Sequence, residues 1–448
     1  MVIDTLPPKI HNAYWFQAFN AVSWQIALGS PLILFARELG APAVVLGLLA
    51  GLAPLTSVLQ LFVAPYAERI GYRNLMVKGW SARVGTLVFL TALPLAAGFL
   101  PASTVIAVLV LIMLAFTLMR GTATCAWLPW VTAIVPRSLR GLYLSRDRTF
   151  ISLASVAALT VSGLFLFNHQ SITAYSIVFG ISFLGGVISL YFLNRIPEPV
   201  TAPATGQARL SVHWTSLLQD GAFVRLLIFS AMVQVWVAST ATFVIVFVRE
   251  QVQLVDGTIL WLTAGASLVA ILALRLLRDR VDRLGSRPFL GLVFLWWVVY
   301  YLLWFLMAAQ WIGGVLILAP LLLLSAGFFG SIYDLALTRL LMNTVGDRPA
   351  TTQYFALQSV IVSLLGGFAP ILWGVLLDSL RGVHVSIGGS ELNGFAIFFG
   401  LQVLLLTPVL IALTQVREAS ATSTAALLRR IFVALPSRRI ASLTSRRG

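Results

Sequence analysis

The chain has 448 residues, of which 59% are hydrophobic and only 10% charged, and its formal net charge is +15. Soluble domains ordinarily contain about 25% charged residues, so this composition excludes an ordinary soluble protein. Apolar runs of roughly 20 residues, separated by short loops, predict helices that cross a hydrocarbon core about 30 Å thick. The single cysteine, Cys125, excludes an internal disulfide and a Cys-based metal cluster.

Twelve spans are predicted, followed by a basic tail. The first six cover approximately 12–36, 43–66, 79–98, 104–134, 149–168 and 173–194, and the second six cover 223–248, 258–277, 288–309, 313–341, 354–379 and 394–416. The predicted parts are an N-terminal bundle (1–195), a linker (196–220), a C-terminal bundle (221–416) and a tail (417–448). The linker prediction rests on its prolines and polar residues.

The basic residues are distributed unequally between the two sides of the predicted membrane. Most lie in the tail and in loops on one side, whereas Arg37, Arg249 and Arg381 lie on the other. By the positive-inside rule, both termini and the linker are expected to be cytoplasmic. This placement argues against nucleic acid as the partner. The near absence of lysine is typical of a G+C-rich bacterial genome, so we expect a bacterial inner membrane protein.

A charged hairpin between the second and third spans of each half has the order acid, Arg, one residue, Gly, one residue, Arg. The first copy contains Glu68, Arg69, Gly71 and Arg73, and the second contains Asp282, Arg283, Gly285 and Arg287. Trp24 and the dyad Arg37-Glu38 also recur at matching places as Trp236 and Arg249-Glu250. Six spans per half make this a parallel repeat, for which a substrate site is expected between the halves.

With these repeats the chain resembles the major facilitator superfamily from Ala13 to about Val416. It keeps the Arg, Gly and Arg of the family's loop signature but has Ala64 for the first Gly and Glu68 for the Asp, and the first position of the second copy is Arg278. The resemblance implies two six-helix bundles that rock about a central site, with the hairpins as cytoplasmic gates. A solvated turn that obeys the positive-inside rule is the alternative for each hairpin.

Asp334 is the one carboxylate well inside a predicted span, and Arg120 is its repeat mate in the fourth span. An ionisable group in hydrocarbon is costly and indicates a cavity or a partner. Arg120 is therefore predicted to bind an anionic group of the substrate, and Asp334 to carry a proton. The alternative is that Asp334 pairs with Arg339 or Arg275 and only joins helices.

The first span of each half carries polar and aromatic side chains that suit a hydrated cavity. Gln17, Asn20 and Trp24 share one helical face, and Gln25 is adjacent to it. Gln234 and Trp236 are the candidates in the seventh span. Substrate binding by these residues and hydrogen bonding between helices are both consistent with the pattern. The GxxxG of 47–51 and the pair Gly366-Gly367, near Pro370, are expected to allow close helix packing.

Together these features predict a monomeric, all-helical secondary transporter, coupled to protons and without a cofactor, metal or catalytic centre. The predicted substrate is a small anionic, zwitterionic or lipophilic solute. The basic tail, with Arg429 and Arg430 beside an apolar stripe, is predicted to bind anionic lipid. A transporter-like scaffold or receptor that moves nothing is the alternative, because few charges lie within the spans.

Overall fold

The structure, a computed structural model, describes residues 8–135, 139–168, 171–197, 217–345, 351–383, 385–387 and 390–416. Within these ranges, 12 helical segments are long and apolar enough to cross a membrane, which confirms the predicted number. Each also lies where the sequence predicts it; the first, for example, runs from His11 to Glu38. The tail and most of the linker fall outside the described residues.

The N-terminal bundle contains the first six spans, of which the first, second and fourth are each divided into shorter helices. Its helices are α1 (His11–Ala27), α2 (Ser30–Glu38), α3 (Ala43–Ser57), α4 (Gln60–Ile70), α5 (Tyr72–Ala96), α6 (Ala102–Ala123), the 3₁₀ turn η1 (Thr124–Ala126), α7 (Trp127–Ile134), α8 (Arg140–Asn168) and α9 (Ala174–Leu193). The first span is interrupted at Gly29, and Pro31 lies in the first turn of α2, where a missing N–H costs nothing.

The C-terminal bundle repeats this plan, with its first span also divided in two. Its helices are α11 (Gly221–Val237), α12 (Thr240–Glu250), α13 (Asp256–Leu284), α14 (Arg287–Ala308), α15 (Val315–Val345), α16 (Thr351–Ser379) and α17 (Gly394–Gln415). A short antiparallel hairpin of β1 (Val385–Ile387) and β2 (Ser390–Leu392) precedes α17. This hairpin is the one described departure from the all-helical prediction, and it lies in a loop.

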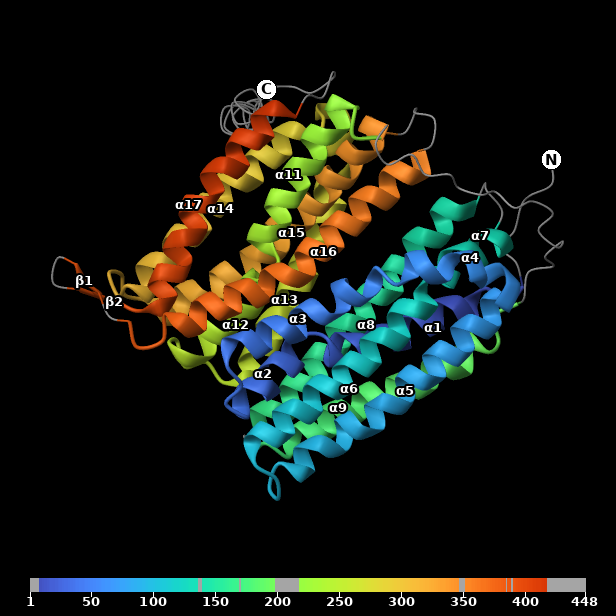
Figure 1. Ribbon diagram of the computed structural model, residues 1–448, viewed down its shortest axis with the longest axis horizontal. Helices are drawn as coiled ribbons and strands as arrows, with labels where there is room; N and C mark the ends of the chain where they lie inside the picture. The colour runs from blue at the N-terminus through green and yellow to red at the C-terminus, as the bar shows by residue number, and fades with distance from the viewer. Residues whose placement is uncertain are drawn as a thin grey trace, which may run out of the picture.

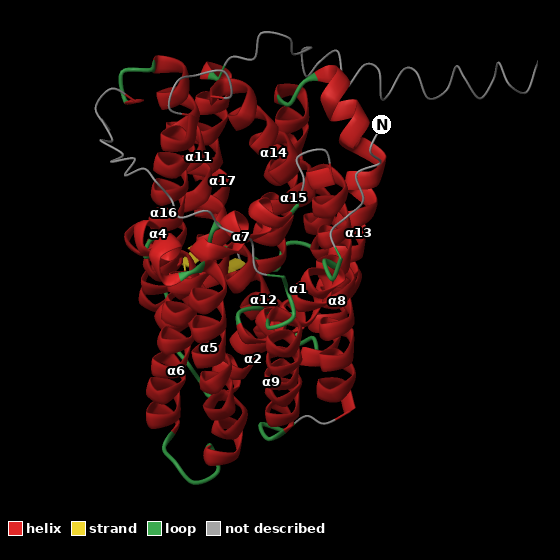
Figure 2. Ribbon diagram, turned by 90° about the vertical axis from the view of Figure 1, so that its right-hand side faces the viewer, coloured by secondary structure: helices red, strands yellow, loops and turns green. Residues whose placement is uncertain are grey.

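The two bundles contact one another mainly along two pairs of helices, α3 with α16 and α8 with α13, and more lightly where α2 meets α12 and α13 and where α3 meets α12. Figure 1 shows them side by side near α2, α3, α12 and α16 and spread apart towards the ends of the chain. We call the face where α1 begins and α17 ends the terminus face, and the opposite face, where α2 and α12 end, the latch face. Figure 2 shows the helices running between these two faces.

The contact between α3 and α16 depends on glycine. A Cβ on Gly51 would lie 2.2 Å from the carbonyl oxygen of Gly367, and one on Gly47 would lie 2.1 Å from the carbonyl oxygen of Pro370. Because both obstacles are backbone atoms, no side-chain rotation could relieve them. The predicted close packing is confirmed, and the glycines of the two halves make it with each other.

The hairpin glycines recur for a conformational reason. Gly71 has φ +85° and Gly285 has φ +90°, values that residues with a Cβ rarely adopt. Each glycine ends one helix and allows the chain to begin the next almost at once, as α4 is followed by α5 at Tyr72. The sharp reversal explains why both copies of the motif keep this residue.

Candidate functional site

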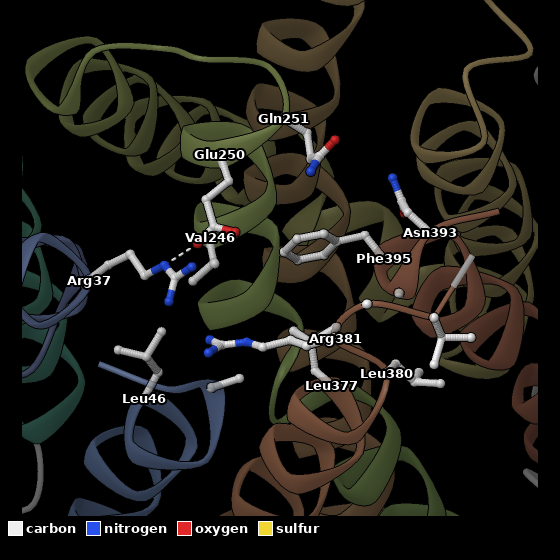
Figure 3. A pocket seen from close by; sticks show the side chains of 14 residues that line it. Arg37, Leu46, Val246, Glu250, Gln251, Leu377, Leu380, Arg381, Asn393 and Phe395 are labelled. Carbon is white, nitrogen blue, oxygen red and sulfur yellow. Dashed lines mark ion pairs between the residues drawn. The ribbon is translucent and has the colours of Figure 1, made fainter. Parts of the chain in front are cut away.

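Two reciprocal ion pairs join the bundles at the latch face. Arg37 at the end of α2 pairs with Glu250 of α12, and Arg249 of α12 pairs with Glu38 of α2. Arg249 also binds the Asp256 carboxylate of α13 through its Nε, at 2.8 Å. Figure 3 shows the Arg37–Glu250 pair crossing from one bundle to the other. The Arg of each dyad thus pairs with the Glu of the other dyad. Each bundle supplies one cation and one anion to the two pairs.

A third connection lies beside these pairs. The Asp378 carboxylate near the end of α16 accepts hydrogen bonds from the backbone N–H groups of Ala43 (2.9 Å) and Val44 (2.7 Å), which begin α3. A carboxylate at a helix N-terminus also interacts favourably with the helix dipole. Arg381 pairs with the same carboxylate at 3.1 Å. We call the seven residues Arg37, Glu38, Arg249, Glu250, Asp256, Asp378 and Arg381 the latch.

The cavity beside Arg37, Glu250 and Arg381 has a volume of about 200 Å³. Ligand pockets usually occupy about 300–1,000 Å³, so this space suits water better than a substrate. The latch pairs join the two bundles at this face.

The latch was not predicted from the sequence, although its signal was present. Both Arg-Glu dyads were recognised as repeat partners, but a single dyad resembles an ordinary charged helix end. The Arg of one dyad can pair with the Glu of the other only when the ends of the two first spans meet. Recurrence of Arg-Glu at the end of the first span in both halves was the observation that could have identified it.

The charged hairpins at the terminus face make contacts within their own bundles. Arg73 Nη2 donates to the carbonyl oxygen of Asn194, at the end of α9, at 2.7 Å. Arg287 Nη2 donates to the carbonyl oxygen of Thr414, near the end of α17, at 3.1 Å. The second arginine of each motif thus binds the end of the last span in its half. The side chains of the other charged motif residues, Glu68, Arg69, Asp282 and Arg283, lie outside the described part of the structure.

The N-terminal bundle buries a polar network around Arg83 of α5. Its Nη1 donates to Asn20 Oδ1 at 2.8 Å, and its Nη2 donates to Ser23 Oγ at 3.3 Å. The guanidinium also lies over the rings of Trp80 (5.0 Å) and Phe116 (4.7 Å). Arg83 is fully buried. Asn20, predicted to contact substrate, therefore orients an arginine that the sequence analysis did not select.

Arg120 and Asp334 each lie within electrostatic reach of an arginine of the N-terminal bundle. The charge that acts on Arg83 is that of Arg120. The charge that acts on the Asp334 carboxylate is that of Arg148 in α8, across the boundary between the bundles. Asp334 is exposed and Arg120 is half-buried. Both side chains therefore remain accessible.

A second carboxylate, which is buried, lies at the end of a span rather than well inside one. Asp147, at the start of the fifth span, is only 6% exposed and is hydrogen-bonded to Gln17 of α1. Burial of this acid between α1 and α8 depends on helix packing, which the local charge pattern does not reveal.

The remaining candidates divide between half-buried positions and the protein core. Trp24, Gln25 and Gln234 are half-buried. Gln234 packs against Gly366, where an added Cβ would lie only 2.5 Å from Gln234 Nε2. Trp236 is 1% exposed, and its Nε1 donates to the carbonyl oxygen of Gln402 at 2.9 Å. This position does not fit the predicted contact between Trp236 and substrate, because neighbouring aromatic rings surround it.

The described residues contain no group of three or more His, Cys, Asp or Glu side chains that could hold a metal ion. Two six-span bundles joined by charged pairs at one face have the architecture of a membrane transporter rather than that of an enzyme. The chain belongs to the Major Facilitator Superfamily, whose family profile matches residues 14–370. None of the curated proteins compared with the chain matches it.

Several solved transporters have similar folds. A mutant of the nucleoside transporter NupG has a TM-score of 0.69 at 12% identity, covering 91% of this chain and 99% of its own. The xylose transporter XylE from E. coli, in an inward-open conformation, has a TM-score of 0.65 at 15% identity, covering 93% and 99%. A bacterial homologue of the human lysosomal transporter Spinster, inward-facing and occupied, has a TM-score of 0.63 at 14% identity, covering 90% and 94%. At these identities the likeness concerns the fold alone.

Proposed function

We propose that this transporter moves a small solute by alternating access and that the structure represents its inward-facing state. In this proposal the terminus face is cytoplasmic, in accordance with the positive-inside rule, and the latch face is extracellular. The observation that carries the proposal is the reciprocal exchange of ion pairs between α2 and α12. These pairs hold the bundles together at the latch face, as a closed outer gate would.

The separation of the bundles at the terminus face supports the same state. Figure 1 shows them spread apart there, where Arg73 and Arg287 bind carbonyl groups of their own bundles. In the opposite state we propose that Glu68, Arg69, Asp282 and Arg283 form the inner gate, with Gly71 and Gly285 shaping the turns. The inward-open XylE and the inward-facing Spinster homologue, which share the fold, are consistent with this assignment.

The free energies required are modest. A partly exposed ion pair contributes about 0.2–1 kcal/mol, and two conformations that differ by a few kcal/mol can both be populated. The latch pairs are partly exposed; the side chains of Arg37 and Glu250 are 20% and 25% exposed. Such pairs can therefore bias the equilibrium towards closure without locking it.

Distance measurements between spin labels test the proposal directly. One label pair, on Ser171 and Gln253, reports the latch face, and another, on Asn74 and Met342, reports the terminus face; all four residues are exposed. Cys125 is first replaced by Ser. Reversing Arg37 to Glu should lengthen the latch-face distance and shorten the terminus-face distance, because like charges would then oppose each other at the outer gate.

The matched control is the charge swap Arg37→Glu with Glu250→Arg, which restores an attractive pair and should restore the original distances. If the two distances change in the same direction, or not at all, alternation between two gates is contradicted. A protein whose distances never change with any variant would instead fit the scaffold or receptor alternative.

We further propose that Asp334 couples transport to protons, with Arg148 as the charge that controls it. Asp334 is exposed in α15, and Arg148 acts on it from α8, so relative movement of the bundles changes their separation. A carboxylate gains protons more readily when a nearby cation moves away. Among proteins of this fold, the D-xylose–proton symporter offers a precedent for proton coupling.

The variant Asp334→Asn tests the coupling. It should abolish the dependence of the spin-label distances on pH, while the matched variant Asp378→Asn, on the latch, should shift the distances but retain their pH dependence. Persistence of the full pH response in Asp334→Asn would refute coupling through this residue.

A further inference from the structure

The N-terminal bundle places two arginines together without an acid to balance them. Arg83 lies over the ring of Phe116 in α6, at 4.7 Å, and Arg120 follows one helical turn later on the same face of α6, so the charge of Arg120 acts on Arg83. The ion pairs described in the structure include neither Arg83 nor Arg120. A buried charge that lacks its counter-charge is strongly destabilising. The arrangement therefore favours an external anion that balances this pair.

The network around Arg83 leaves part of that side chain free. Asn20 and Ser23 accept from its two Nη groups, but Nε is buried and has no hydrogen-bond partner. Asn20 is held in turn, because Trp80 Nε1 donates to its Oδ1 at 3.3 Å. A fully buried arginine with one unsatisfied donor is costly unless a ligand or water completes it.

Arg120 supplies the accessible half of the pair. It is half-buried, and it lies in the second half of α6, towards the terminus face that we propose to be open. No described hydrogen bond or ion pair engages its guanidinium. A ligand entering from the terminus face would thus meet Arg120 first, with the positive charge of Arg83 immediately behind it.

We propose that Arg83 and Arg120 bind the anionic group of the transported solute, a carboxylate or a phosphate. Arginine suits both groups because its planar fork can donate two parallel hydrogen bonds. Asn20, Ser23 and Trp80 act as positioning residues that fix the orientation of Arg83. The proposal rests on the transport function proposed above and assigns the substrate class, an organic or inorganic oxyanion.

Thermal-shift titrations of the purified full-length protein test this assignment. The probes are benzoate, its neutral analogue benzamide, inorganic phosphate and chloride, in Tris buffer with minimal chloride. Benzoate or phosphate should raise the melting temperature in a saturable manner, and benzamide should not. The variant Arg120→Gln should raise the half-saturating concentration about tenfold or more, since a hydrogen bond to a charged group contributes about 1.5–3 kcal/mol.

Two further variants separate binding from folding. Arg120→Lys keeps the charge but loses the fork and should show intermediate affinity. Arg225→Gln removes an exposed arginine of α11 and should leave the titration unchanged. The proposal is overturned if benzamide matches benzoate, if neither oxyanion stabilises the protein, if chloride saturates the same effect, or if Arg120→Gln binds as well as the unmodified protein.

The spin-label distances distinguish failure of this proposal from failure of the transport proposal. Distances that alternate in a protein without oxyanion binding would refute only the substrate class. Oxyanion binding that depends on Arg120, in a protein whose distances do not alternate, would establish the anion site and refute transport.

Discussion

Arg37 and Arg83 have the same side chain, but their surroundings give them different roles. Arg37 is partly exposed and meets Glu250 of the other bundle, so its contact can open when water replaces it. Arg83 is fully buried beside Asn20 and Ser23 and lies over aromatic rings, so its position is fixed. The residue type specifies a cation, whereas burial decides whether that cation acts as a switch or as a permanent part of a binding site.

Gly71 offers a test of backbone conformation at the residue scale. The variant Gly71→Ala should destabilise the protein by about 1–3 kcal/mol, because φ +85° is strained for alanine. Gly85→Ala is the matched control: Gly85 lies in α5 with no other atom within 4 Å of the added Cβ. Alanine there should stabilise by up to about 1 kcal/mol through helix propensity. Unfolding midpoints in detergent would measure both, and equal effects would contradict the argument.

At the scale of elements, the first span of each bundle is divided in two. The division leaves a short outer helix, α2 or α12, that is separate from the long inner helix of the same span. The first span is interrupted at Gly29 between α1 and α2, and the seventh at Ala238–Ser239 between α11 and α12. The outer segments α2 and α12 contact each other and carry the reciprocal latch pairs. The short outer helices can thus respond to the latch with less movement of the long inner helices.

The crossing of α3 and α16 provides a prediction at the same scale. In Gly51→Ala the new Cβ would lie 2.2 Å from the carbonyl oxygen of Gly367, in the opposite bundle. The bundles must separate to accommodate it, so the Ser171–Gln253 distance should lengthen. In the control Gly121→Ala the Cβ would lie 2.4 Å from the carbonyl oxygen of Thr56, in the same bundle.

The control should therefore lower the unfolding midpoint and leave the distance distribution between the bundles unchanged. The same spin-label measurement and the same thermal scan apply to both variants. Lengthening in Gly121→Ala but not in Gly51→Ala would show that the α3–α16 contact does not control closure.

At the scale of the whole molecule, hydrophobicity predicted the spans well, because the membrane requires long apolar helices. The repeat gave the bundle organisation, but it did not reveal which repeated residues meet. Trp24 and Trp236 occupy matching positions, yet Trp24 is half-buried and Trp236 lies in an aromatic core. Arg120 likewise acts on Arg83 rather than on Asp334, its mate in the repeat. Which residues contact each other depends on the rotation of each helix about its axis and on the separation of the bundles. The local pattern of a single sequence shows neither.

Salt provides the last prediction, because it acts on the latch of the intact molecule. Raising the ionic strength from about 0.01 M to 1 M shortens the Debye length from about 30 Å to 3 Å and weakens partly exposed pairs. Two pairs of about 0.2–1 kcal/mol each should then lose most of their attraction and raise the population with a long Ser171–Gln253 distance about two- to thirtyfold. The variant Glu38→Gln with Glu250→Gln removes both reciprocal pairs, so it should begin with the longer distance and respond little to salt. An equal salt response in the variant and the unmodified protein would mean that charges elsewhere, and not the latch, govern closure of this face.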